Sequence, residues 1–205
     1  MQRLILGGLM AAAGFAGSAA FADEGDIISG GWYISPMLQY DALDKNRAAN
    51  SGIAADLAGG YNIVRHFAVE ANYSYGEFNI PNIGHQGMQQ FTVDGLVKFL
   101  PRAVVDPYFI IGTGVLITKY PGLNEINSGV AEAGAGALTG LGDQTGSFRM
   151  QLRTEAKYRR AWIQNQVFDP KNPGDILISV GVQFEFGAPT DRGPQSEPPG
   201  TVPRI

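Results

Sequence analysis

Alternation of apolar and polar residues is the dominant pattern of this chain, and it is clearest over residues 60–75. From Phe67 to Tyr75 every second residue is apolar, while the residues between them include Glu70 and Asn72. Successive side chains of a β-strand point to opposite faces. The pattern therefore predicts a strand with one apolar face and one face that is small or polar.

The preceding segment, residues 53–62, alternates in the same way and predicts a second strand joined to the first by a short turn. Asp56 and Glu70 both fall on the small or polar face of their strands. A soluble sandwich would bury the apolar face and leave the carboxylates in water. A membrane barrel does the reverse, with apolar residues toward lipid and charged residues toward a lumen.

Eight segments of this kind can be marked along the chain. The fifth is apolar on both faces, so its facing is ambiguous, and Pro36 interrupts the first because proline cannot donate a ladder hydrogen bond. The predicted strands cover residues 31–40, 53–62, 67–75, 88–99, 108–118, 129–138, 147–158 and 176–186.

The connections are expected to alternate in length. Polar or turn-rich connections are predicted at 41–52, 79–87, 119–128 and 161–174, and generally shorter ones at 63–66, 100–106 and 139–146. Long loops at one end and short turns at the other are typical of outer-membrane barrels, whose long loops face outside the cell. The pattern predicts an all-β, eight-stranded, antiparallel up-and-down transmembrane barrel.

The two ends of the chain differ from the strands. Residues 1–22 combine Arg3, an apolar run at 4–15 and a small-x-small site at 20–22, which predicts a secretion signal peptide. Residues 23–187 are expected to form the barrel. Residues 188–205 are rich in proline and predict a disordered periplasmic tail.

Composition narrows the function. The net charge is −4 and there is no lysine or arginine run, which argues against a nucleic-acid partner. The absence of cysteine excludes disulfides. The chain has only two histidines and no cysteine to serve as metal ligands, so neither a metal site nor a cofactor is expected.

Charged residues on the small or polar faces are the candidate site. An unpaired buried charge is costly, so they are expected to pair across the lumen. Since side chains nearly fill the interior of an eight-stranded barrel, the pairs would plug it. The primary cluster is Glu70, Asp94, Lys98, Arg153, Glu155 and Lys157, and the secondary residues are Asp56, Arg149 and Glu185.

Five short motifs occur along the predicted strands. They are Gly59-Gly60-Tyr61, Glu70 ten residues after Gly60, Leu96-Val97-Lys98, Leu152-Arg153-Thr154-Glu155, and the segment 179–187. In their order and spacing they resemble the N-terminal eight-stranded barrel of the OmpA family of outer-membrane proteins. The likeness covers roughly residues 30–187, and the Pro-rich tail resembles that family's linker toward a periplasmic domain.

The resemblance implies a switchable salt-bridge cluster that gates the passage of small ions. Carried over by position, its members are Glu70, Lys98 and Arg153. The family's second interior acid, on the sixth strand, has no clear match, and Glu155 and Glu132 are the candidates to replace it.

The function expected is that of a structural barrel in the Gram-negative outer membrane, with a narrow gated path for small ions left open. The alternatives are a membrane-embedded lipid-modifying enzyme, a surface-loop adhesion protein and a soluble ligand-binding barrel. Ser74 and Ser128 have no histidine placed with them, so no enzyme is expected. The expected partners are membrane lipid, lipopolysaccharide, the barrel-assembly machinery during insertion, and extracellular ligands of the loops.

Overall fold

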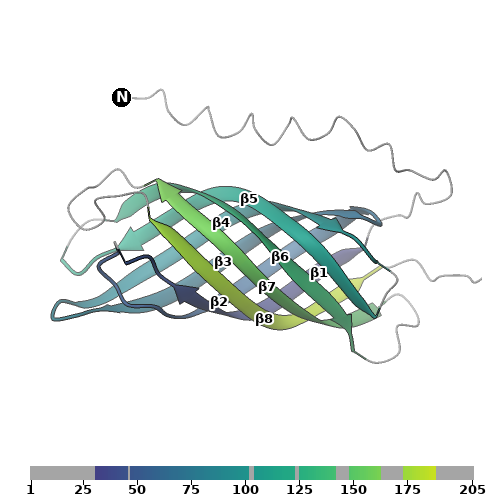
Figure 1. Cartoon of the computed structure of the whole chain (residues 1–205), viewed down its shortest axis with the longest axis horizontal. Helices are drawn as coiled ribbons and strands as arrows, with labels where there is room; N and C mark the ends of the chain where they lie inside the picture. The colour runs from purple at the N-terminus through teal and green to yellow at the C-terminus, as the bar shows by residue number, and fades with distance from the viewer. Residues whose placement is uncertain are drawn as a thin grey trace, which may run out of the picture.

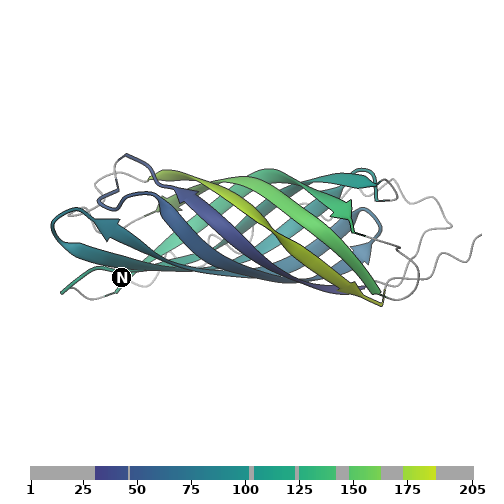
Figure 2. The same cartoon turned by 90° about the horizontal axis from the view of Figure 1, so that it is seen from below.

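The computed structural model describes residues 31–45, 47–101, 104–122, 125–141, 148–162 and 173–187. These residues form eight antiparallel strands that close into a barrel (Figures 1 and 2). The predicted up-and-down architecture is confirmed, because each strand pairs with its neighbours in sequence and β1 pairs with β8. The strands are β1 Trp32–Ala42, β2 Gly52–Val64, β3 Phe67–Ile80, β4 Gly84–Lys98, β5 Val105–Lys119, β6 Ile126–Gly140, β7 Phe148–Trp162 and β8 Gly174–Phe186.

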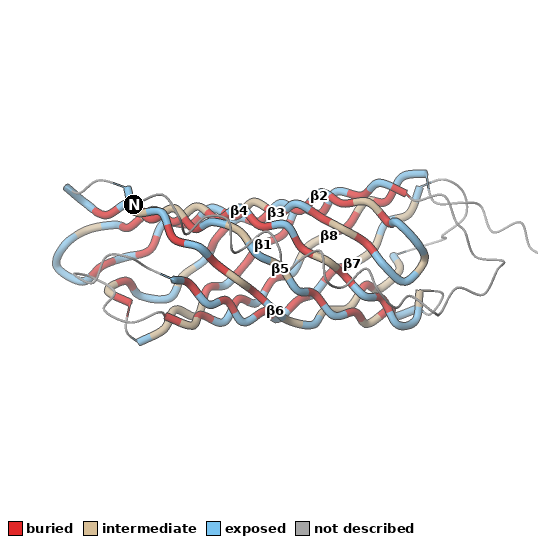
Figure 3. The backbone as a smooth tube through the Cα atoms, turned by 90° about the horizontal axis from the view of Figure 1, so that it is seen from above, coloured by how far each residue is buried: buried red, intermediate tan, exposed pale blue. Residues whose placement is uncertain are grey.

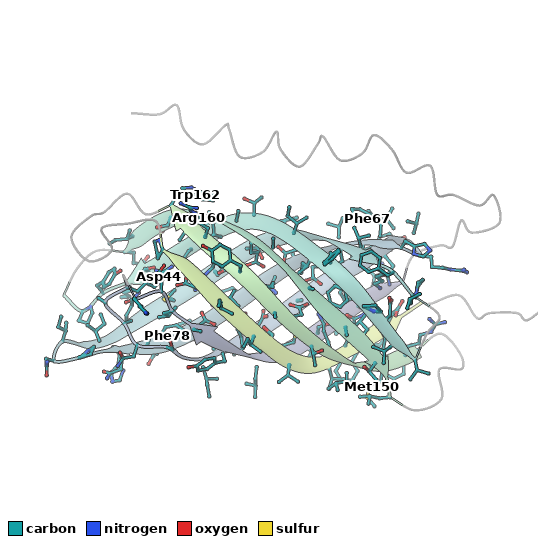
Figure 4. All side chains as sticks on the ribbon, viewed as in Figure 1. Asp44, Phe67, Phe78, Met150, Arg160 and Trp162 are labelled. Carbon is teal, nitrogen blue, oxygen red and sulfur yellow. The ribbon has the colours of Figure 1, made fainter. Side chains whose placement is uncertain are left out.

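The barrel has two distinct rims. The loop rim, on the left in Figure 1, carries the β1–β2, β3–β4, β5–β6 and β7–β8 connections. The turn rim, on the right, carries the other connections together with the start of β1 and the end of β8. Phe78 and Trp162 lie toward the loop rim and Phe67 and Met150 toward the turn rim (Figure 4).

Burial alternates residue by residue along the strands, as Figure 3 shows. Glu70 is 1% exposed and faces the interior, whereas its neighbours Val69 and Ala71 face outward. The structure also settles the facing of β5, where Tyr108 is buried inside and Ile111 is 63% exposed outside. The outer wall is therefore the apolar one.

Pro36 lies inside β1 and interrupts the ladder on one side only. Between β1 and β8 the paired residues pass from Ile34 directly to Met37, while Pro36 still lies opposite Leu57 of β2. Proline has no backbone N–H to donate to β8, and the pairs of both Ser35 and Pro36 are missing on that side.

The predicted connection 79–87 is wrong, and so is the simple alternation of long and short connections. β3 runs on to Ile80 and β4 begins at Gly84, so a tight turn joins them, with Asn82 at a φ of 64°. The β5–β6 connection is likewise shorter than predicted, since the strands extend to Lys119 and from Ile126. At the loop rim only the β1–β2 and β7–β8 connections are long.

β3 runs longer than predicted because its polarity inverts near the loop rim. Phe78 and Ile80 point inward while Glu77 and Asn79 point outward. This end of β3 is therefore apolar toward the interior and polar toward the outside. The interior at this end contains a loop-side cluster of buried apolar residues: Ala49, Ala54, Phe78, Ile80, Met88, Leu116, Tyr120, Val130 and Ala161.

A second buried apolar group, the turn-side cluster, occupies the interior toward the other rim and consists of Tyr33, Ala68, Leu96, Tyr108, Ile110 and Leu138. No helix among the described residues is long and apolar enough to cross a membrane. The predicted signal peptide, residues 1–22, and the predicted tail, residues 188–205, lie outside the described residues.

Candidate functional site

Arg153 of β7 is the centre of the charged interior. Its Nη1 donates to Oε2 of Glu70 at 2.8 Å and its Nη2 to Oε1 at 2.7 Å, a bidentate pair. Its Nε donates to Oε1 of Glu155 at 2.6 Å. All three side chains are fully buried. In the closed barrel of eight strands, β3 and β7 are four strands apart in both directions and so lie on opposite walls. The Arg153–Glu70 pair therefore crosslinks the lumen.

Two tyrosines complete this central group. Tyr33 Oη donates to Glu70 at 2.9 Å, and Tyr108 Oη donates to Glu155 at 2.6 Å. Each ring lies over a glycine of the neighbouring strand, Gly60 beside Tyr33 and Gly136 beside Tyr108, where an added Cβ would overlap the ring. The glycines thus let the phenol groups lie along the wall and reach the carboxylates.

Lys157 forms a second group on the loop-rim side of Arg153. Its Nζ donates to Glu132 of β6 at 2.8 Å and lies 3.8 Å from Glu155. Gln90 Nε2 also donates to Glu132, at 2.7 Å. Glu132, an alternative raised for the missing acid of the sixth strand, is therefore the acid that pairs with this lysine, while Glu155 bonds mainly to Arg153.

Asp56 and Asp94 face the same interior but are poorly matched. Among the described residues neither carboxylate oxygen of Asp56 has a hydrogen-bond partner. Asp94 accepts a hydrogen bond from the Thr92 hydroxyl at 3.2 Å on Oδ2. Its Oδ1 has no hydrogen-bond partner among the residues that the structure describes. Both residues are at most 4% exposed. The β2–β4 side of the lumen thus carries carboxylates without a direct cation.

Lys98 is separate from the central group, contrary to the trio that the family resemblance implied. Its Nζ donates to Asn62 at 2.7 Å and lies 5.7 Å from the centre of the Tyr33 ring. Asn62 in turn donates to Glu185 at 2.8 Å. Arg149 is half-buried at the same turn-rim end. The structure therefore joins Glu70 to Arg153 but places Lys98 in another layer.

A third charged group holds the β1–β2 connection at the loop rim, and sequence reasoning missed it. Asp175 accepts hydrogen bonds from Arg47 at 2.7 Å, from Arg159 at 2.9 Å and from the backbone N–H of Asp44 at 3.0 Å. Arg159 also lies 3.2 Å from Asp41. This connection is thus fastened over the mouth of the barrel.

The missed residues lie just beyond the predicted strand ends. Asp41 follows the predicted end at residue 40, Arg159 follows residue 158, and Asp175 precedes residue 176. Extending the period of two by one residue at each end would have found them. Arg47 lies in a connection, where no periodic signal exists.

The chemistry available in the interior is that of ion pairs and hydrogen bonds. No group of three or more metal-ligating side chains suited to a metal ion occurs in the ranges that the structure describes. The arrangement can crosslink strands, exclude large solutes and hold water and small ions at the unmatched carboxylates.

Comparison with known proteins identifies the family. The model of the outer membrane protein beta-barrel domain matches residues 8–184. The structure is similar to that of Neisserial surface protein A, with a TM-score of 0.59, 14% identity, and coverage of 77% of this chain and 99% of that one. It is also similar to the N-terminal β-barrel domain of OprF from Pseudomonas aeruginosa, with a TM-score of 0.48, 18% identity, and coverage of 78% and 99%.

The comparison with curated protein sequences found no match. At these identities the structural likeness shows the fold alone, whereas the family match spans most of the chain. The predicted resemblance to OmpA-type barrels is confirmed at this level. The chain belongs to the outer membrane protein beta-barrel domain family and is a barrel of the Gram-negative outer membrane.

Proposed function

We propose that this protein is a structural outer-membrane barrel whose lumen is closed in its resting state. The observation that carries the proposal is the fully buried Arg153, bonded to Glu70 across the interior. The loop-side cluster lies between this crosslink and the loop rim, and the turn-side cluster adjoins the crosslink through Tyr33 and Tyr108. An ion crossing the lumen would have to break charge-assisted hydrogen bonds and then pass between desolvated apolar side chains.

In the proposed orientation the loop rim faces outside the cell. Both ends of the barrel segment, the start of β1 and the end of β8, lie at the turn rim and so face the periplasm. Residues 188–205 would then follow β8 into the periplasm, after residues 1–22 have been removed as a signal peptide. Residues 23–187 are the barrel domain in this proposal, inserted by the barrel-assembly machinery.

A non-enzymatic role is supported by the positions of the residues that a lipid-modifying enzyme would need. Ser74 and Ser128 are buried on the inward face, at 5% and 4% exposure. His85 is exposed on the outer face of β4. A serine and a histidine on opposite faces of the wall cannot share a proton.

Potassium flux from liposomes tests the closed lumen. We expect liposomes that contain a verified amount of folded protein, counted by its heat-dependent gel mobility, to release potassium no faster than empty liposomes. Steady flux through the unmodified barrel would contradict the proposal. It would favour a narrow gated path for small ions instead, and the unmatched Asp56 and Asp94 predict that such a path prefers cations.

The outer wall offers a test of membrane placement. Ile111 lies midway along β5 and is 63% exposed, so in a soluble protein Ile111→Arg would be nearly neutral. Against lipid we expect the substitution to destabilise the barrel by about 2–4 kcal/mol in urea unfolding from bilayers. Asn79→Arg, outward on β3 but beyond the apolar wall, is the control and should leave stability nearly unchanged. Equal effects at the two positions would argue against a lipid-facing belt.

A further inference from the structure

A groove on the outer wall at the loop rim is distinct from the interior site. It has a volume of about 590 Å³ and lies over β3, β4 and β5, beside the start of the β5–β6 connection. This volume falls in the range of pockets that hold small organic ligands. Its polar lining includes Tyr75, Glu77, His85, Gln89, Lys119 and Glu125.

The register of the strands shows how the groove is built. One rung places Tyr75 opposite Gln89, which lies opposite Ile117. The next rung runs from Glu77 through Gly87 to Lys119, so a glycine lies between an acid and a lysine. A Cβ at Gly87 would meet only the Cβ of Lys119, at 3.9 Å. The missing side chain is what hollows the wall.

The groove begins where the apolar wall ends. The rung immediately below it pairs Tyr73 with Phe91, whose ring centres are 4.6 Å apart on the outer face. Below that rung the outward residues of β4 are apolar or glycine, among them Val93, which is 59% exposed. An aromatic pair at the edge of an apolar belt marks the boundary between acyl chains and head groups. The groove therefore lies at the level of lipid head groups.

The lining suits a ligand rich in hydroxyl groups. Tyr75 is 39% exposed, and its Oη donates to Oε1 of Glu77 at 2.7 Å, which fixes both side chains. The exposed ring offers an apolar face, the carboxylates of Glu77 and Glu125 accept hydrogen bonds, and Lys119 donates them. Lys119 lies 3.8 Å from Glu125, so the lysine is already balanced by an acid.

That charge balance disfavours a site for phosphate. Two carboxylates within the groove would repel an anion, and the nearby lysine charge is matched by Glu125. Sugar hydroxyls, in contrast, both donate and accept, and they need no net positive charge. The groove therefore favours a saccharide, because carboxylates, an amide and an aromatic face surround the space that Gly87 leaves open.

We propose that this groove binds uncharged core sugars of lipopolysaccharide in the surrounding leaflet. The proposal rests on the orientation proposed above, in which the loop rim faces outside the cell. Membrane-anchored sugar is the source that fits, because the groove opens on the outer wall directly above the lipid-facing residues rather than at the mouth of the lumen.

The test uses isotope-labelled protein in phospholipid nanodiscs that contain increasing fractions of lipopolysaccharide with its core sugars. We expect amide signals of Gln89 and Lys119 to shift as the fraction rises. In Gly87→Leu the added side chain fills the hollow without a backbone clash, and the midpoint should rise about tenfold. The matched control is Gly59→Leu, outward on β2, where a Cβ meets nothing within 4 Å and the midpoint should not change.

Three results would overturn the proposal. The first is an unchanged midpoint in Gly87→Leu. The second is an equal shift with sugar-free phosphatidylglycerol, which would mean that charge rather than sugar is recognised. The third is equal saturation by free core oligosaccharide in nanodiscs without lipopolysaccharide, which would assign the groove to a soluble glycan. These discs contain the glycolipid in both leaflets, so binding does not depend on which way the barrel is inserted. Potassium flux is measured in a separate experiment. Failure of sugar binding is therefore distinguishable from failure of the closed-barrel function.

Discussion

Replacing Arg153 by alanine is expected to lower the unfolding free energy by about 3–5 kcal/mol, because two buried carboxylates would lose their counter-charge. Glu70 and Glu155 are both fully buried beside the guanidinium. Tyr33 and Tyr108 would still donate to them, but one neutral hydrogen bond each does not replace a bidentate ion pair. Urea unfolding in detergent or lipid, followed by tryptophan fluorescence, measures the loss.

The matched control is Arg160→Ala, in the same strand but exposed on the outer wall (Figure 4). Its effect should stay within about 0.5 kcal/mol, as for most exposed substitutions. A triple variant, Arg153→Met with Glu70→Gln and Glu155→Gln, removes the charges together and should recover much of the lost stability. Equal unfolding of Arg153→Ala and the unmodified protein would contradict the central crosslink.

Phe78→Ala is expected to cost about 3–5 kcal/mol as well, for a different reason: it removes the most deeply buried aromatic side chain of the loop-side cluster. Phe78 is 1% exposed and packs inside the barrel although its neighbours on β3 face water. We also expect potassium flux from liposomes to rise in this variant, since the apolar seal at the loop rim would be opened.

Ile83→Ala is the control for this second substitution, because Ile83 lies in the β3–β4 turn and is 55% exposed. Neither stability nor flux should change appreciably in it. Loss of stability in Phe78→Ala without a rise in flux would mean that the charged interior alone closes the lumen. No loss of stability would contradict the loop-side core itself.

The two variants examine separable parts of the closed barrel. Arg153 acts through electrostatics between strands distant in sequence, so its effect should depend on both acids. Phe78 acts through packing in a cluster that β3 shares with the strands around it. We expect the two losses of free energy to be nearly additive, because Phe78 packs in the loop-side cluster whereas Arg153 bonds to the central carboxylates, and sites without shared partners are energetically independent.

Much of the interior could be predicted from alternation alone. Glu70, Arg153 and Lys157 were assigned inward because each shares the parity of small or polar residues in its strand. The partners of these charges could not be predicted, since pairing depends on the stagger between strands. This is why Lys98, expected beside Glu70, lies instead beside Asn62, and why Glu132 was only an alternative.

The end of β3 was less predictable for a different physical reason. Alternation identifies a strand by the contrast between its faces, and in β3 that contrast reverses near the loop rim. Residues 76–80 continue β3 with apolar side chains inward and polar ones outward. These residues do not continue the apolar-outward pattern of residues 67–75, so they resemble a loop. The predicted strand therefore ended too early.

The pattern of residues alone specifies a membrane barrel with charges inside, because a period of two residues fixes which side chains share a face and lipid tolerates only the apolar one. The folded barrel is needed to establish which charges meet, how the apolar clusters lie around them, and where Gly87 leaves a hollow on the outer wall. Those features depend on the register between strands, which brings together residues far apart in the chain and leaves no periodic trace within any one strand.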